Sequence, residues 1–493
     1  MSPRRRKVLQ HSTPHWVYVI AILLLAFIVR LIFVSKASIW HDEGFSIMLA
    51  QMNPVDIWLR TARDVHPPFY YELLGVWMRL FGSSEVIVRA LSVLVGVGTV
   101  GVLYLLVKRV RNYHTALIAA LFAAVGPMLV RYSQETRMYA LEGLLMVTAL
   151  YGVVVIIQQP QKQLGYWLYF AAVLLGLYTH YFTVLVVLSL WLFGFWQWLR
   201  QRHQPSARSI LEQPRWWVAN VAAAVLFLPW LPSAIAQFSR GQGLSWLTHT
   251  SLRTPFDFVW QMISFTDGRS LSVLYWLGGL SALAVVGYVW ISDRSSQRLS
   301  RLLVVYVVVP VAIVMTVSLF KPIYHERYLV FVTPVYYALL AIAINELLHR
   351  KRNWEIAAVT LTVALLLVGV RNVYAQSSHR MREVFSVVNS NALPTDKLIA
   401  GELYTYFDGS YYNHTGLPMQ LYTGFGRPNG YGESGLIYDR NVYIDSWAGV
   451  APGRVWVIGK TGDQKYFDNI PANWQLVSTE QDGYSVARLY QVK

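Results

Sequence analysis

The chain has 493 residues, of which 55% are hydrophobic and only 14% are charged, whereas soluble proteins carry about a quarter charged residues. This composition excludes a single water-soluble globule and intrinsic disorder, and the absence of cysteine excludes disulfides, thiolate metal sites and a thiol nucleophile. The net charge of +16 comes from residues 1–371, where 32 Lys or Arg face 15 Asp or Glu, so membrane topology explains it without a nucleic-acid partner.

Apolar runs of about 20 residues predict eleven transmembrane helices. The predicted spans are 16–35, 86–107, 115–130, 138–157, 165–180, 182–199, 217–236, 271–291, 303–320, 329–347 and 354–371. The first is too long for a cleavable signal peptide, and no small-residue cleavage site follows it. We therefore expect a mostly α-helical, polytopic membrane protein in a lipid bilayer.

The positions of Lys and Arg orient these spans. Basic residues gather in alternate loops, at Arg4 to Lys7, Lys108 to Arg111, Arg200 to Arg215, Arg294 to Arg301 and Arg350 to Arg352. Because basic loops stay in the cytoplasm, we expect a cytoplasmic N-terminus in the plasma (inner) membrane. The long loops 36–85 and 237–270 and the tail are then expected on the outer face.

The tail, residues 372–493, differs in composition from the rest of the chain. Strand-like runs (Lys397 to Leu403, Val455 to Gly459, Trp474 to Ser478, Tyr484 to Val492) alternate there with turns rich in Gly, Asn, Asp and Pro. The sequence therefore predicts two domains, a transmembrane domain over residues 1–371 and an extracytoplasmic α/β domain over residues 372–493.

Polar residues gather in the outward loops of the membrane domain. Asp42 and Glu43 directly follow the first span, and adjacent acids this close to lipid are costly unless they are paired or serve a site. A carboxylate here could take a proton from a hydroxyl or bind a divalent cation. A solvated pair at a helix end is the ordinary alternative.

The next outward cluster, Asp64 to Tyr71, contains Asp64, His66 and Tyr70 around a pair of prolines. Because the prolines lack backbone donors and restrict the chain, they would present these side chains from a rigid loop before a helix beginning near Tyr71. The same residues could simply mark a helix start.

Three more outward segments carry cations or histidine. They contain Arg131, Glu135, Arg137 and Tyr139; His180; and Lys321, His325, Glu326, Arg327 and Tyr328. Guanidinium groups bind phosphate bidentately, although arginines also snorkel to headgroups and tyrosines form interfacial belts. The clusters share one face, and the sequence lacks a phosphate-binding glycine loop, a dinucleotide fingerprint and an HExxH motif. These features favour an outer-face site that uses no cytosolic nucleotide.

The order of these motifs resembles that of the GT-C glycosyltransferases. The motifs that carry the resemblance are Asp42-Glu43, Asp64 to Pro68, Arg131 to Tyr139, Leu228 to Pro232 and His325 to Tyr328. Over roughly residues 16–345 the chain resembles the bacterial branch related to protein O-mannosyltransferases and the aminoarabinose–lipid A transferase. The resemblance implies a hexosyl- or pentosyltransferase that moves sugar, with inversion, from a polyprenyl-phosphate donor to a hydroxyl on a protein, lipid or envelope glycan at the outer face.

The resemblance also implies residue roles. Asp42 is expected to be the catalytic base, supported by Glu43. The donor phosphate is expected to meet Arg131, Arg137, Lys321, Arg327 and His66. Substrate binding is expected from Asp64, Tyr70, Glu135, Tyr139, His180, His325, Glu326 and Tyr328. No cofactor is assigned, although a divalent cation would find conceivable ligands in Asp42, Glu135, His180 and His325.

A transporter or flippase for a lipid-linked sugar is the main alternative. It should place ionisable residues at mid-membrane and show repeat symmetry. Only Arg30, Arg89 and Glu142 lie within or near the spans, and no repeat is apparent. A glycan-binding receptor would leave the outward clusters unexplained. Because every cluster precedes residue 329, we expect the tail to be dispensable for the chemistry.

Overall fold

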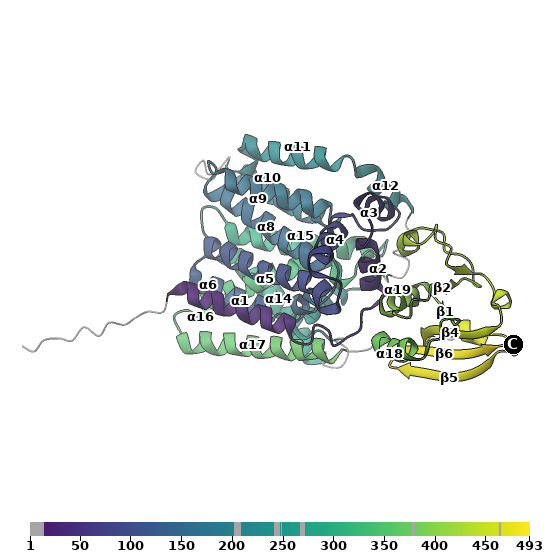
Figure 1. Ribbon diagram of the computed structural model, residues 1–493. Helices are drawn as coiled ribbons and strands as arrows, with labels where there is room; N and C mark the ends of the chain where they lie inside the picture. Colours follow the sequence, from purple (N-terminus) through teal and green to yellow (C-terminus); the bar gives the residue numbers. More distant parts are fainter. Residues whose placement is uncertain are drawn as a thin grey trace, which may run out of the picture.

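The computed structural model describes residues 14–201, 209–240, 247, 249–266, 272–376, 380–462 and 465–493. A helical bundle makes up most of the molecule, and a smaller domain with a β-sheet lies at one end of it (Figure 1). The basic segment Arg4 to Lys7 lies outside the described residues, as do parts of the segment 200–215 and of the loop 237–270.

Helices occupy all eleven predicted positions. Among the described residues, seven are long and apolar enough to cross a membrane: α5 (Glu85–Val110), α8 (Tyr139–Gln158), α10 (Thr183–Gln201), α14 (Ser272–Ser292), α15 (Leu299–Ser318), η3 (Glu326–Val332) with α16 (Thr333–Leu348), and α17 (Arg352–Ala375). Two bent pairs, α6 (Tyr113–Val125) with α7 (Pro127–Ser133) and α11 (Pro214–Phe227) with α12 (Leu231–Arg240), raise the number to nine. The other positions hold the shorter helices α1 (His15–Leu31) and α9 (Gln163–Leu177). The helical membrane architecture is confirmed, and eleven crossings stay a prediction.

The bend between α6 and α7 is built around an arginine. Because α7 begins with a proline, which has no backbone N–H, carbonyl groups at the end of α6 lose a helical donor. Arg30 of α1 replaces it and donates to the carbonyls of Ala123 at 3.0 Å and Ala124 at 2.8 Å. A Cβ at Gly126 would lie 2.3 Å from the ring of Tyr337, so the bend requires glycine. Arg30 therefore stabilises a broken span.

Shorter helices lie at the end of the bundle that faces the sheet domain (Figure 1). Helices α2 (His41–Ala50), α3 (Pro54–Thr61) and α4 (Phe69–Phe81) lie between the bundle and the sheet domain (Figure 1), and α13 (Thr254–Ser264) packs against α14 and α17. Helix α4 begins directly after the proline pair, close to the expected start at Tyr71. These helices occupy much of the two long loops expected from the sequence.

The tail folds as a mixed α/β domain. Its strands are β1 (Lys397–Ala400), β2 (Met419–Tyr422), β3 (Tyr443–Ile444), β4 (Gly453–Lys460), β5 (Gln475–Asp482) and β6 (Ser485–Val492), in the order β3-β2-β1-β4-β6-β5. Strands β1 to β4 pair in parallel, with Leu398 opposite Trp456, and β6 runs antiparallel to β4 and β5. The domain also contains α18 (Met381–Asn391), α19 (Leu403–Tyr412), α20 (Lys465–Asp468), η4 (Gly432–Leu436) and η5 (Trp447–Gly449). All four predicted strand-like runs contain strands.

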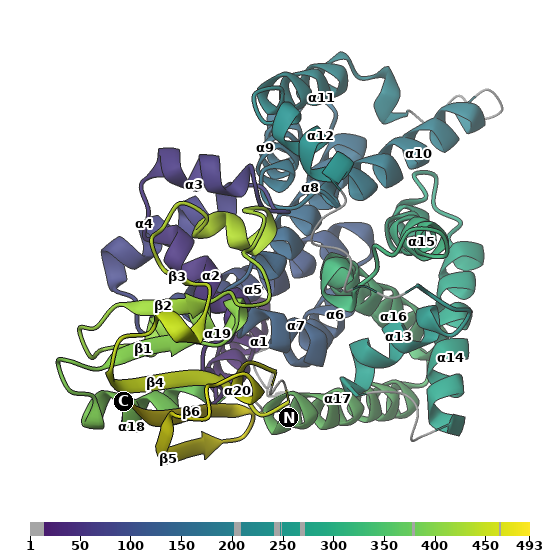
Figure 2. The same cartoon turned by 90° about the vertical axis from the view of Figure 1, so that its right-hand side faces the viewer.

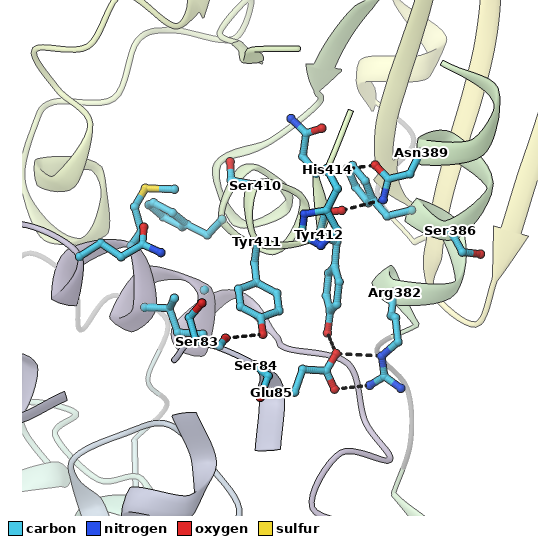
Figure 3. Close-up of a pocket in the computed structure, with 17 residues that line it drawn as sticks. Ser83, Ser84, Glu85, Arg382, Ser386, Asn389, Ser410, Tyr411, Tyr412 and His414 are labelled. Atoms are coloured by element: carbon cyan, nitrogen blue, oxygen red, sulfur yellow. Dashed lines mark hydrogen bonds and ion pairs between the residues drawn. The ribbon is translucent and has the colours of Figure 1, made fainter. Parts of the chain in front are cut away.

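The sheet domain docks on α2 and covers only part of the end of the bundle, leaving α10, α14 and α15 uncovered (Figure 2). A Cβ at Gly44 of α2 would lie 2.8 Å from the carbonyl oxygen of Phe407 in α19, so the two helices meet through a glycine. Beside this contact, a cavity of about 700 Å³ is bridged by paired side chains (Figure 3). Glu85 accepts hydrogen bonds from Arg382 at 2.6 Å and from Tyr412 at 2.5 Å. These contacts join the tail to the membrane half.

Candidate active site

The first turn of α2 carries the adjacent acids. Asp42 is 3% exposed and Glu43 is 1% exposed, so they are not the solvated pair of the alternative interpretation. Trp40 is the N-cap of the helix, and its backbone N–H donates to Glu43 at 3.4 Å. Because successive residues of a helix are about 100° apart, the two carboxylates leave α2 in different directions.

Glu43 points to Arg89 of α5. The guanidinium donates to the carboxylate from Nε at 2.7 Å and from Nη2 at 2.5 Å, and the backbone N–H of Thr136 donates at 2.9 Å. Burial alone would raise the pKa of Glu43, but Arg89 and these hydrogen bonds bring it below its ordinary value. Glu43 is therefore an ionised anchor that joins α2, α5 and the segment before α8.

Asp42 points to two other arginines. Its Oδ2 atom lies 2.8 Å from Nη1 of Arg327 and 3.8 Å from Nε of Arg137, while Oδ1 lies 3.4 Å from Nε2 of His41. Burial would raise the pKa of Asp42, but the two guanidinium groups outweigh this effect and hold the pKa well below its ordinary range. Asp42 is thus a buried carboxylate that stays ionised.

Asp42 faces a cavity of about 610 Å³ at the junction of the membrane half and the tail. The membrane half lines it with Asp42, Asp64, His66, Arg137, Arg327 and Tyr328. The tail lines it with Leu403, Tyr404 and most of the segment 427–434. The tail thus forms one wall of this cavity, and its expected dispensability for the chemistry stays a prediction.

Contacts with α3 and the turn after it hold this part of the tail beside the cavity. Arg60 donates two hydrogen bonds to Asp439, at 2.8 and 2.7 Å. The backbone N–H of Gly432 donates to the carbonyl of Arg63 at 2.8 Å. Sequence analysis missed these tail residues because the tail has no charge excess and no motif that marks them.

Glu433 is the tail acid beside Asp42. Ligand atoms of the two carboxyl groups lie within 4.8 Å of each other. Burial together with the charge of Asp42 raises the pKa of Glu433 well above its ordinary value, which favours its protonated form.

A divalent cation was considered from the sequence, with Asp42, Glu135, His180 and His325 as ligands. In the described part of the chain, the group of three that could hold a metal is instead His41, Asp42 and Glu433, whose ligand atoms lie within 4.8 Å of one another. Asp42 is also paired with Arg327 and Arg137. A divalent cation therefore stays a prediction, and we derive no step through one.

Asp64 and His66 enter the cavity from the turn between α3 and α4. Asp64 is 4% exposed, and burial raises its pKa to about 6. The rings of His66 and His180 stack with centroids 5.5 Å apart, and burial lowers the pKa of His66 well below its ordinary value. His66 therefore lines the cavity as a neutral ring. Behind it, Nδ1 of His180 lies 3.2 Å from Glu142.

The other residues expected at the site lie around it. The ring of Tyr139 lies 5.6 Å from the guanidinium carbon of Arg327. Arg131 pairs with Glu135 at 3.3 Å and lines a separate cavity of about 190 Å³. Tyr70, Lys321, His325 and Glu326 do not line the 610 Å³ cavity. Of the five groups expected to meet the donor phosphate, the cavity thus contains Arg137, Arg327 and His66.

Comparison with known proteins identifies the fold. Residues 65–232 match the family model described as dolichyl-phosphate-mannose-protein mannosyltransferase, and no curated protein matches the chain by sequence. ArnT from Cupriavidus metallidurans is similar in its apo state (TM-score 0.65, 13% identity, 96% of this chain and 98% of that chain). It is also similar when bound to undecaprenyl phosphate (TM-score 0.63, 13% identity, 97% and 98%).

An archaeal structure has the same fold. The oligosaccharyltransferase AglB from Archaeoglobus fulgidus, in complex with an inhibitory peptide and a dolichol-phosphate, is similar with a TM-score of 0.53 and 12% identity. The match covers 90% of this chain and 69% of that chain. Together with the family model, these structures confirm the expected GT-C resemblance and its fold, a helical membrane domain with a C-terminal sheet domain.

Proposed function

We propose that this chain, which has the fold of the GT-C glycosyltransferases, is an integral-membrane glycosyltransferase that uses a polyprenyl-phosphate sugar. It would transfer a hexosyl or pentosyl group to a hydroxyl of a protein, a lipid or an envelope glycan. The observation that carries this proposal is the buried Asp42 carboxylate, 2.8 Å from Arg327, in a cavity between the bundle and the tail. One neighbour is bound to undecaprenyl phosphate and another to a dolichol-phosphate, which supports such a donor.

The proposed reaction is a single displacement. The acceptor oxygen attacks the anomeric carbon opposite the phosphate, so the configuration inverts. The bond from that carbon to the phosphate oxygen breaks, and its electron pair stays on the polyprenyl phosphate. Arg137 and Arg327 line the cavity and would neutralise this charge as it develops. A cavity carboxylate takes the hydroxyl proton, and the resemblance assigns this base to Asp42, with Glu43 anchoring its helix.

We place the prenyl chain of the donor in an apolar groove between α13, α14, α15 and α16. The groove has a volume of about 280 Å³, and its wall includes Val332 and Tyr336, which follow Arg327 along the chain. A prenyl chain lying there would bring its phosphate end toward the arginines of the cavity.

The proposed site faces the outside of the plasma (inner) membrane. Support comes from the basic segments Lys108 to Arg111 and Arg350 to Arg352, which lie at the ends of α5 and α16, on the side that the positive-inside rule makes cytoplasmic. A reporter enzyme fused after Lys493 should be active only outside the cytoplasm. Cytoplasmic activity of the reporter would contradict this orientation.

A transfer assay tests the activity. The purified protein in proteoliposomes should move label from a radiolabelled undecaprenyl-phosphate hexose or pentose to a lipid or protein acceptor of the host membrane extract. Asp42→Asn should abolish the transfer, whereas Asp468→Asn, a change at an exposed position of α20, should leave it intact. Loss of transfer in EDTA would support the divalent cation considered from the sequence, and an unchanged rate would argue against it.

The same assay separates the enzyme from a transporter. A flippase would move labelled donor between leaflets without forming a new glycosidic bond. Two of the intramembrane charges that could favour a transporter have structural partners: Arg30 donates to backbone carbonyls, and Arg89 pairs with Glu43. Labelled donor that crosses the bilayer with no labelled acceptor would reject the transferase.

A further inference from the structure

The cavity holds a second carboxylate in a different setting. Asp64 lies in the turn after α3, and its backbone N–H donates to the carbonyl of Thr61 at 3.0 Å, which fixes the turn. Its side chain lines the cavity and is almost fully buried. Among the described residues, its Oδ2 atom has no hydrogen-bond partner. A buried acceptor without a partner is costly, so a carboxyl group in this state beside a cavity is suited to meet a substrate.

The carboxylate oxygens of Asp42, by comparison, already have partners. Arg327 and Arg137 approach its Oδ2 atom, His41 approaches Oδ1, and the Glu433 carboxyl lies nearby. A carboxylate held by two guanidinium groups has a low proton affinity and would release an acquired proton at once. Its contacts suit the alignment of the arginines better than the capture of a proton.

The surroundings push the proton affinities of the two acids apart. Burial raises the pKa of Asp64 to about 6, and the charge of Asp42 adds to this effect, while Arg137 and backbone hydrogen bonds from Val65 and His66 oppose it. The charged and titratable groups that face Asp64 are Asp42, His66, Tyr71, Arg137, Tyr181 and Glu433. Paired acids whose pKa values diverge in this way commonly divide the roles of base and electrostatic stabiliser.

We propose that Asp64 is a second catalytic carboxylate of this site and receives the proton of the acceptor hydroxyl, while Asp42 stays ionised between its arginines. The inference rests on the proposed function and moves its proton-transfer step from Asp42 to Asp64. The hydroxyl O–H bond breaks as the oxygen bonds to the anomeric carbon, and the proton goes to the Asp64 carboxylate. The polyprenyl phosphate leaves with its electron pair, and the Asp64 carboxyl later returns the proton to water.

The pH dependence of transfer distinguishes the two acids. With Asp64 as the base, kcat/KM for transfer from a labelled undecaprenyl-phosphate sugar should rise with pH, with a midpoint near 6. With Asp42 as the base, the profile should be flat from about pH 5 to 8, because Asp42 is already ionised throughout. A flat profile would overturn the inference while leaving the glycosyltransferase intact. Absence of transfer by the unaltered protein would overturn both.

Variants complete the test. Asp64→Asn should lower kcat by about 10²–10⁴-fold and remove the rise of the rate with a midpoint near pH 6. The affinity for undecaprenyl phosphate, followed by tryptophan fluorescence, should stay within twofold. Asp64→Glu should be faster than Asp64→Asn, and its rate should again rise with pH. Retention of the rate by Asp64→Asn, or loss of phosphate binding in step with the rate, would contradict a role in proton transfer. Asp468→Asn serves as the matched control.

Discussion

Arg89 and Glu43 form a bidentate ion pair inside the protein, with side chains only 3% and 1% exposed. Arg89 also donates to the carbonyls of Val34 and Ala37, so the pair ties the loop before α2 to the span α5. This arrangement separates the roles of two adjacent acids. Glu43 fixes the start of α2, and Asp42, the preceding residue, is thereby held toward the cavity.

Removing one member of this pair should destabilise the fold. Glu43→Gln leaves the Arg89 charge buried without its carboxylate, which typically costs about 3–5 kcal/mol. We expect a lower thermal unfolding midpoint in detergent than for the unaltered protein. Replacing both residues with Met should recover most of the loss, because no uncompensated charge then remains. An unchanged midpoint for Glu43→Gln would mean that the pair does not anchor α2.

Arg327 should matter more to catalysis than to folding. Arg327→Gln removes the guanidinium 2.8 Å from Asp42 and a charge that would face the donor phosphate. We expect kcat for sugar transfer to fall by about 10²–10³-fold, the usual cost of losing one such donor. Arg131→Gln is the matched control, because Arg131 lines the separate cavity, and should reduce kcat far less. Equal losses of kcat for both variants would mean that the donor phosphate does not bind beside Arg327.

Asp64 should reduce stability at neutral pH. Its folded-state pKa of about 6 lies above its ordinary value of 3.8, so the folded state holds the proton more tightly and stability falls as pH rises between these values. The shift corresponds to about 3 kcal/mol. Asp64→Asn should therefore unfold at a higher temperature than the unaltered protein above pH 6, and the difference should vanish near pH 4. A variant that is less stable at pH 7 would contradict this assignment.

Docking of the tail on α2 should be necessary for transfer. Gly44→Ala places a Cβ 2.8 Å from the Phe407 carbonyl oxygen, and such overpacking typically costs about 1–3 kcal/mol. We expect faster proteolysis of the tail and a reduced transfer rate, because the tail forms one wall of the cavity. Gly449→Ala is the control, since an added Cβ there meets nothing within 4 Å. Full transfer activity in a variant whose tail is cleaved faster would support the expectation from the sequence that the tail is dispensable for the chemistry.

Local patterns account for the part of the fold that could be predicted. The span expected at 86–107 is the helix Glu85–Val110, and the strand-like run Val455 to Gly459 lies within Gly453–Lys460. Runs of apolar side chains and turn residues are local in the sequence, and a membrane requires each span to satisfy its own backbone hydrogen bonds. The breaks in the helices were harder to predict from the sequence, because the bend at Gly126 depends on an arginine that is distant along the chain.

The sequence by itself determined the membrane architecture, the separate tail and the acids and arginines of the loops, because hydropathy, charge placement and turn chemistry act over short stretches of chain. Only the tertiary structure decided that Asp42 faces the cavity while Glu43 pairs with Arg89. It also brought Glu433, far away in the sequence, into contact with Asp42. The proton affinity of a buried acid depends on which charges packing places beside it, and no local pattern records that neighbourhood.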